Sequence, residues 1–154
     1  MKITSQLGRL SLFTIYFWFG ILKVLGYSPA EALVQNLFSQ TIGTWLDFNL
    51  FCIGFGFFEC ALGILWLFPK LSKISLYILI AHMLTTFLPV LVLTEEIWQS
   101  WFTPTLVGQY IIKNLALISL ALFISKSYEQ EQLELKRESK SLMKFEGFTS
   151  KLVS

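Results

Sequence analysis

Residues 48–68 read FNLFCIGFGFFECALGILWLF, an almost wholly apolar stretch with a single carboxylate, Glu59, well inside it. About 20 apolar residues are enough for a helix to cross the hydrocarbon core of a bilayer. A charge at the bilayer centre costs roughly 2.5–3.5 kcal/mol on insertion scales. We therefore expect a membrane-spanning helix that turns Glu59 toward the interior of a helix bundle.

Three further apolar stretches accompany this one, at residues 10–27, 74–93 and 106–125. Of the 154 residues, 55% are hydrophobic and only 14% are charged, whereas soluble domains are about 25% charged. The sequence therefore predicts an all-α integral membrane protein. We expect a four-helix bundle over residues 1–126 and a polar cytoplasmic tail over residues 127–154.

Lysine and arginine mark one side of the expected bundle. They precede the first span, fill the second loop and recur in the tail, as Lys2, Arg9, Lys70, Lys73, Lys126, Lys136, Arg137, Lys140 and Lys144. The loops at residues 28–47 and 94–105 contain acidic residues and no lysine or arginine. The positive-inside rule then predicts an up-down-up-down bundle with both termini cytoplasmic, and Arg9 is interpreted as an interfacial topology signal.

Two segments outside the spans have local patterns. Ser28-Pro29-Ala30-Glu31 is typical of a helix start, which predicts a short outer helix from Pro29 to about Ser39. In the tail, lysines recur every fourth residue at positions 136, 140 and 144, a helical face that suits anionic lipid. The alternative is a solvated, partly disordered tail, as is common at polar termini.

Cys52 and Cys60 lie in the same expected helix. A helix rises about 1.5 Å per residue, which separates them by roughly 12 Å, whereas a disulfide needs Cα atoms within about 7 Å. We interpret both as small packing residues. The sequence has no metal-ligand cluster or phosphate loop, and no basic stripe for nucleic acid, so neither a metal nor a nucleic-acid partner is expected.

Each expected span carries a polar or small-residue face. Gly56, Glu59 and Gly63 share one face at helical spacing, and small residues let a neighbouring helix approach closely. The other spans have stripes at Tyr16-Gly20-Lys23-Tyr27, at His82-Thr85-Thr86-Pro89, and at Gln109-Lys113 beside Tyr110-Asn114. These faces predict one shared polar interior.

The ionisable residues of that interior leave alternatives open. Glu59 and Lys113 form either a structural ion pair or part of a ligand site; Lys23 either joins them or snorkels to the outer interface. His82 is either a neutral packing residue or a ligand and proton carrier. Glu59 is the one acid inside a span, so a buried positive charge remains unless Asp47 pairs with Lys23 or a lysine is neutral. An uncompensated buried cation is costly. A bound anion or a quinone would relieve that cost.

The same residues occur in an order that resembles the DoxX-like membrane proteins. The similarity covers about Arg9 to Ile124 and includes Phe17-Trp18-Phe19-Gly20-Ile21-Leu22-Lys23, Ser28-Pro29-Ala30-Glu31, Glu59 with Gly63, His82 with Thr86-Phe87-Leu88-Pro89, and Gly108-Gln109-Tyr110-Ile111-Ile112-Lys113-Asn114-Leu115. The resemblance implies a four-helix, multi-pass protein of the bacterial inner membrane.

Some DoxX-like proteins are small subunits of thiosulfate:quinone oxidoreductases, and others are associated with oxidative stress. The resemblance implies a redox-associated accessory subunit with a redox partner and a polar pocket for a quinone or small anion, without a covalently bound cofactor. The ligand-binding residues it implies are Lys23, Glu59, His82, Lys113 and Asn114. The alternative is a non-enzymatic membrane assembly factor, or a small-molecule permease component, whose buried charges are structural.

Overall fold

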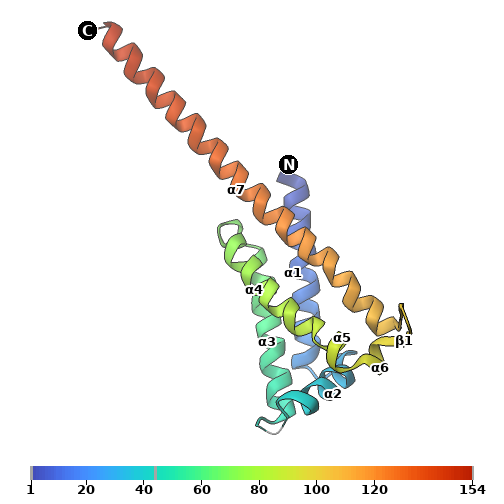
Figure 1. Cartoon of the computed structure of the whole chain (residues 1–154). Helices are drawn as coiled ribbons and strands as arrows, with labels where there is room; N and C mark the ends of the chain where they lie inside the picture. The colour runs from blue at the N-terminus through green and yellow to red at the C-terminus, as the bar shows by residue number, and fades with distance from the viewer. Residues whose placement is uncertain (1, 44, 154) are drawn as a thin grey trace.

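The computed structural model describes the backbone of residues 2–43 and 45–153, and side chains over residues 3–43 and 45–143. Its long helices are α1 (Lys2–Val24), α3 (Phe48–Trp66), α4 (Ser72–Phe87) and α7 (Leu106–Val153) (Figure 1). Within the described chain, four helical segments are long and apolar enough to cross a membrane: Ile3–Val24, Phe48–Trp66, Pro69–Val92 and Leu106–Met143. The prediction of a helical, multi-pass membrane protein is confirmed at this level.

Shorter elements connect the long helices. They are α2 (Glu31–Thr41), the 3-10 turn η1 (Pro69–Leu71), α5 (Pro89–Val92), α6 (Thr94–Ile97), β1 (Trp98–Ser100) and β2 (Thr103–Pro104). The strands β1 and β2 pair in antiparallel orientation. Figure 1 shows α2, α5 and α6 together at the end of the bundle away from both chain termini. A hydrogen bond of 2.9 Å from Asn36 Nδ2 to Glu96 Oε1 links α2 to α6 there.

Helices α1 and α3 pack backbone against backbone in antiparallel orientation. A Cβ atom placed on Gly20 would lie 2.6 Å from the carbonyl oxygen of Gly56, and one on Gly56 would lie 2.7 Å from that of Gly20. About two turns further along α3, a Cβ on Gly63 would lie 2.9 Å from the backbone nitrogen of Phe17. The inward-facing Gly56-Glu59-Gly63 face is therefore confirmed, because all three residues are buried.

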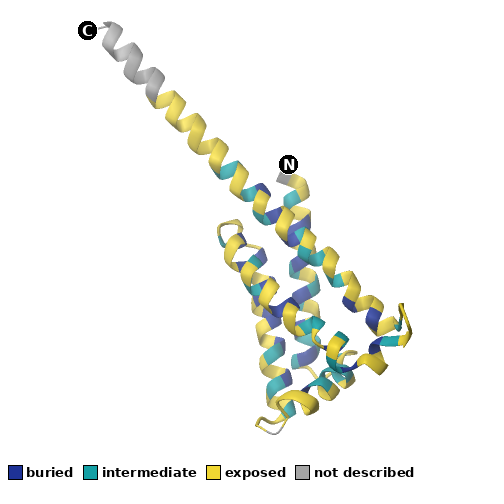
Figure 2. Ribbon diagram, in the orientation of Figure 1, coloured by how far each residue is buried: buried dark blue, intermediate teal, exposed yellow. Residues whose placement is uncertain are grey.

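The apolar core joins all four long helices. Figure 2 shows buried positions along the bundle, whereas residues 133–143 of α7 are exposed. Large apolar side chains on the outer faces are also exposed, among them Phe57, Leu84 and Leu115, as expected for helices that contact lipid chains. The buried core comprises Leu12, Tyr16, Leu62, Trp66, Leu79, Met83, Ala121 and Ile124.

The third span is present as the segment Pro69–Val92, but it and the outer helix differ in detail from the prediction. The third span, expected over residues 74–93, begins at Ser72 and breaks after Phe87. Pro89 explains the break, because proline has no N–H to continue the helical ladder, and α5 begins at this residue. The outer helix begins at Glu31 with Ala30 as its N-cap. The residue expected as the cap, Ser28, instead accepts the Glu31 N–H through its backbone oxygen at 3.1 Å.

The tail is helical rather than partly disordered. Helix α7 continues to Val153 without a break at the expected boundary near Lys126, and its end projects away from the bundle (Figure 1). Residues 126–146 contain no glycine or proline and are rich in the straight-chain residues that favour helices. Lys136 and Lys140 are exposed, and the side chain of Lys144 lies outside the described side chains.

The glycine contacts between α1 and α3 generate a stability prediction. The unfolding free energy of Gly56→Ala should be about 1–3 kcal/mol lower than that of Gly54→Ala, because overpacking a close contact costs energy of this order. Gly54 is the matched control, since a Cβ there meets nothing within 4 Å, and both changes gain the same helix propensity. The measurement is reversible unfolding in bicelles. Equal stabilities for the two variants would mean that α1 and α3 do not pack this closely.

Candidate functional site

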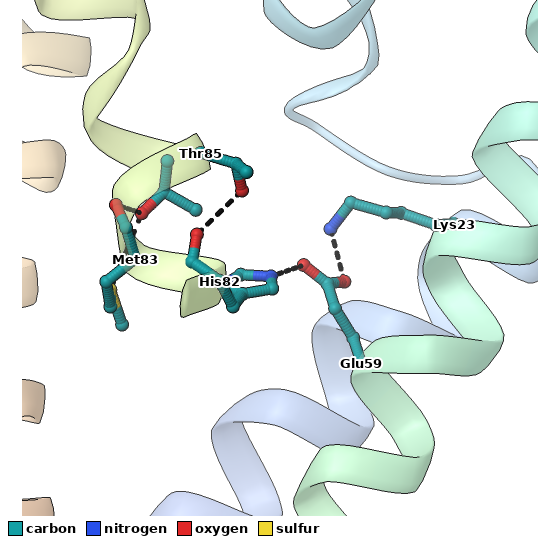
Figure 3. A network of polar contacts seen from close by, with 6 residues as sticks. Lys23, Glu59, His82, Met83 and Thr85 are labelled. Atoms are coloured by element: carbon teal, nitrogen blue, oxygen red, sulfur yellow. Dashed lines mark hydrogen bonds and ion pairs between the residues drawn. The ribbon is translucent and has the colours of Figure 1, made fainter. Parts of the chain in front are cut away.

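Helices α1, α3 and α4 each bring one ionisable residue to a common point inside the bundle. Lys23 Nζ on α1 lies 2.6 Å from Glu59 Oε2 on α3. The other carboxylate oxygen, Glu59 Oε1, lies 3.2 Å from His82 Nε2 on α4 (Figure 3). The three side chains are between 3% and 7% exposed. We call Lys23, Glu59 and His82 the buried triad.

The register of α1 and α3 explains why Lys23 reaches Glu59. Lys23 follows Gly20, and Glu59 follows Gly56, by the same three positions. In an antiparallel pair centred on the two glycines, the Cα atoms are then offset by roughly 9 Å along the axis. Side chains in a helix lean toward its N-terminus, so the Lys23 and Glu59 side chains lean toward one another and close this gap.

The hydrogen bonding of the triad fixes the role of each His82 nitrogen. The Glu59 carboxylate accepts, so His82 Nε2 carries the hydrogen that it donates to Glu59 Oε1. In the neutral imidazole, Nδ1 is then an acceptor. His82 Nδ1 and the Tyr16 hydroxyl are both buried and have no hydrogen-bond partner among the described residues. The Tyr16 and His82 rings meet edge to face at 5.5 Å, so these two groups belong to one site.

Aromatic rings enclose the triad. The His82 ring stacks on Phe55 at 5.3 Å and on Phe58 at 5.6 Å, with interplanar angles of 10° and 14°. The Lys23 ammonium lies 5.7 Å from the centre of the Phe55 ring, a cation–π geometry. Apolar surroundings keep water away and strengthen the attraction between Lys23 and Glu59. On α4, the Thr85 hydroxyl donates to the His82 carbonyl oxygen at 2.6 Å.

The predicted pairing of Glu59 with Lys113 was wrong. Lys113 is exposed, and its ammonium lies 4.9 Å from the centre of the Tyr110 ring on the same helix. Helix α7 instead turns Ile111 and Ala121 inward. The physical reason is that the apolar stripe of α7 packs against the core, which directs the neighbouring polar stripe outward. The long Lys113 stem can then carry its charge toward the membrane interface.

The structure places Asn114 and Lys23 differently from Lys113. Asn114 is half-buried and lies at helical spacing from inward-facing Ile111 and Ala121. Lys23 does not snorkel to the outer interface, because its side chain is 7% exposed and paired with Glu59. With Lys113 outside, Lys23 and Glu59 give the buried triad one lysine cation paired with one carboxylate. The uncompensated cation expected from the sequence is therefore not part of the triad.

Sequence reasoning missed two features of the interior. The stripe containing Tyr16 was identified, but its position beside His82 depends on how α1 and α4 meet, which spacing within one helix cannot give. Arg9 was interpreted as an interfacial signal, and its burial within the protein, to 5% exposure, was not foreseen. Its Nη1 donates to the carbonyl oxygen of Trp66 at 3.3 Å. The guanidinium lies where the C-terminal end of α3 exposes backbone carbonyls, which attract cations.

The cysteines agree with the sequence prediction. Cys52 and Cys60 are both free and buried, and Cys60 Sγ lies 3.6 Å from the carbonyl oxygen of Phe17. In the described part of the chain, no three His, Cys, Asp or Glu side chains gather as metal ligands would. The groups that a ligand at the triad could contact are the His82 Nδ1 atom and the neighbouring Tyr16 hydroxyl, which have no hydrogen-bond partner among the described residues.

Comparisons with known proteins were made by family, by sequence and by structure. No family model, no curated protein and no solved structure matches this chain. The resemblance to DoxX-like proteins therefore rests on the quoted residues alone.

Lys23 and Lys113, the two lysines predicted to lie in the polar interior, should affect stability differently when each is replaced by methionine. Lys23→Met leaves the Glu59 carboxylate buried without its cation, and should cost about 3–5 kcal/mol of unfolding free energy. Lys113→Met changes an exposed side chain and should stay within about 0.5 kcal/mol of the wild type. Unfolding in bicelles, followed by tryptophan fluorescence, measures both. Similar losses in the two variants would contradict the placement of Lys113 outside the triad.

Proposed function

We propose that this chain is a DoxX-like protein of the bacterial inner membrane whose buried triad binds the head group of a quinol or quinone. In this proposal it acts as an accessory subunit beside a partner that carries the redox centres. The observation that supports it is that two buried groups beside a complete Lys23–Glu59 ion pair, the Tyr16 hydroxyl and His82 Nδ1, have no hydrogen-bond partner among the described residues. An unsatisfied buried polar group costs about 1–3 kcal/mol, and a ligand that pairs both groups would recover that cost.

The proposed orientation is up-down-up-down with both termini cytoplasmic. The distribution of lysine and arginine supports it, since the basic segments lie at the ends and in the second loop. In this orientation Glu59 and His82 lie near the bilayer midplane, and Lys23 lies toward the outer surface. A hydrophobic ligand such as a quinone would then reach the triad from the lipid phase.

Each residue of the triad has a distinct part in the proposed site. Glu59 holds the His82 tautomer, so that Nδ1 can accept a hydrogen bond from a quinol hydroxyl. The Tyr16 hydroxyl can donate to a quinone oxygen. Lys23 neutralises Glu59 and acts as a positioning residue. Because the pair carries no net charge, a neutral head group suits the site better than a small anion, and Asn114 is kept as a candidate contact on α7.

A second candidate function is the non-enzymatic one, an assembly factor or permease component with structural charges. The observation that favours it is the closed geometry of the ion pair, with 2.6 Å between charged atoms and both side chains 7% exposed. A charge pair that joins α1 to α3, with His82 adding α4, would hold a bundle together without any ligand.

Ligand binding distinguishes the two candidates. Protein in lipid nanodiscs should bind a ubiquinol or menaquinol analogue, and Tyr16→Phe should weaken binding about fivefold, because a neutral hydrogen bond contributes about 1 kcal/mol. Tyr16→Phe removes one hydroxyl that has no partner among the described residues, so the apo protein should keep its stability. Lys113→Met is the matched control and should bind as the wild type does.

Two results would contradict the quinol site. One is a well-folded wild type that binds neither the quinol analogues nor the corresponding quinones, which would favour the assembly-factor candidate. The other is binding that Tyr16→Phe leaves unchanged and Lys113→Met weakens. Isothermal titration or fluorescence quenching gives the affinities, and sulfate and thiosulfate in parallel titrations test the small-anion variant of the site.

A further inference from the structure

A second polar site lies at the opposite end of α1 from the triad. A cavity of about 580 Å³ opens between α1, the turn after α3 and α7. Its polar lining includes Gln6, Arg9, Ser127, Tyr128, Glu131 and Glu134. None of these residues belongs to the triad.

Arg9 provides the positive charge of this cavity. The residue is 5% exposed, and its guanidinium carbon lies 5.9 Å from the centre of the Tyr128 ring. The carbonyl oxygen of Trp66 accepts one of its N–H groups at 3.3 Å, and a guanidinium has five. The planar fork of a guanidinium suits bidentate contact with a phosphate.

The carboxylates of the lining argue against a purely anionic ligand. Glu131 and Glu134 are three residues apart on α7 and both line the cavity, so they share one helix face. A ligand with a phosphate alone would be repelled by the exposed Glu134 carboxylate. A zwitterion with a phosphate at one end and an ammonium group at the other matches both signs of charge.

The position of the cavity indicates where such a ligand comes from. Leu10, which begins the first apolar stretch, and Leu67, which follows α3, both line it and are exposed. On α7, the lining begins with Ser127, where the apolar part of the helix ends. The cavity is therefore at the level where hydrocarbon gives way to lipid head groups.

We propose that this cavity binds the head group of an aminophospholipid such as phosphatidylethanolamine. The phosphate lies against the Arg9 guanidinium, and the ammonium group lies against the exposed Glu134 carboxylate. The acyl chains follow the exposed apolar surface at Leu10 and Leu67. The site is independent of ligand binding at the triad and requires only that the helices span a membrane.

The test is native mass spectrometry of the delipidated full-length protein titrated with phosphatidylethanolamine or with phosphatidylglycerol of the same acyl chains. The wild type should prefer phosphatidylethanolamine by about fivefold or more. Arg9→Gln should weaken its binding about tenfold, because hydrogen bonds to charged groups are the stronger class. Arg137→Gln, an exposed change further along α7, is the matched control and should bind as the wild type does.

A second variant, Glu134→Gln, tests the proposal even if Arg9→Gln fails to fold. Glu134 is exposed, so Glu134→Gln should fold normally and reduce the preference for phosphatidylethanolamine to about twofold or less. Equal binding of the two lipids to the wild type would overturn the proposal, as would a preference that Glu134→Gln leaves unchanged. Glycerophosphoethanolamine, the soluble head group, should bind far more weakly than the lipid, and equally tight binding would contradict the lipid assignment.

Discussion

The buried Lys23–Glu59 ion pair is the interaction on which the arrangement of this bundle depends. A lone carboxylate or ammonium group inside a membrane bundle is costly, so each of the two charges needs the other. The pair forms only where α1 and α3 approach closely, and Gly20 and Gly56 permit that approach. His82 then connects α4 to the free oxygen of Glu59. The close packing of α1 and α3, their register and the pairing of Lys23 with Glu59 therefore support the same arrangement of the two helices.

The two polar sites of the molecule have different electrostatics, which separates their proposed ligands. The triad contains a balanced ion pair inside an aromatic enclosure, and the His82 Nδ1 atom and the neighbouring Tyr16 hydroxyl have no hydrogen-bond partner among the described residues. The cavity beside Arg9 combines a guanidinium with carboxylates and opens where the apolar stretches end. A neutral head group suits the first and a zwitterionic one suits the second. In both, burial of a charged residue determines which helices meet.

The sequence predicted the apolar helices and the inward face around Glu59 because length and small-residue spacing are properties of one helix. The partner of Glu59 was mispredicted because it depends on the rotation of α1 and α7 about their axes. The polar stripe that contains Lys113 predicted an inward position for this residue. The apolar residues Ile111 and Ala121 instead determine which side of α7 faces the core. The sequence left the tail open between a helix and a partly disordered segment, because a polar composition suits both.

The central claim is that Lys23 and Glu59 stabilise the fold as a pair, and a double-mutant cycle in bicelles tests it most directly. The unfolding free energies of wild type, Lys23→Met, Glu59→Gln and the double variant give the coupling. We predict that the double variant is more stable than the sum of the single losses implies, by about 2 kcal/mol or more, because no unpaired charge remains in it. Losses that add within about 0.5 kcal/mol would contradict the claim.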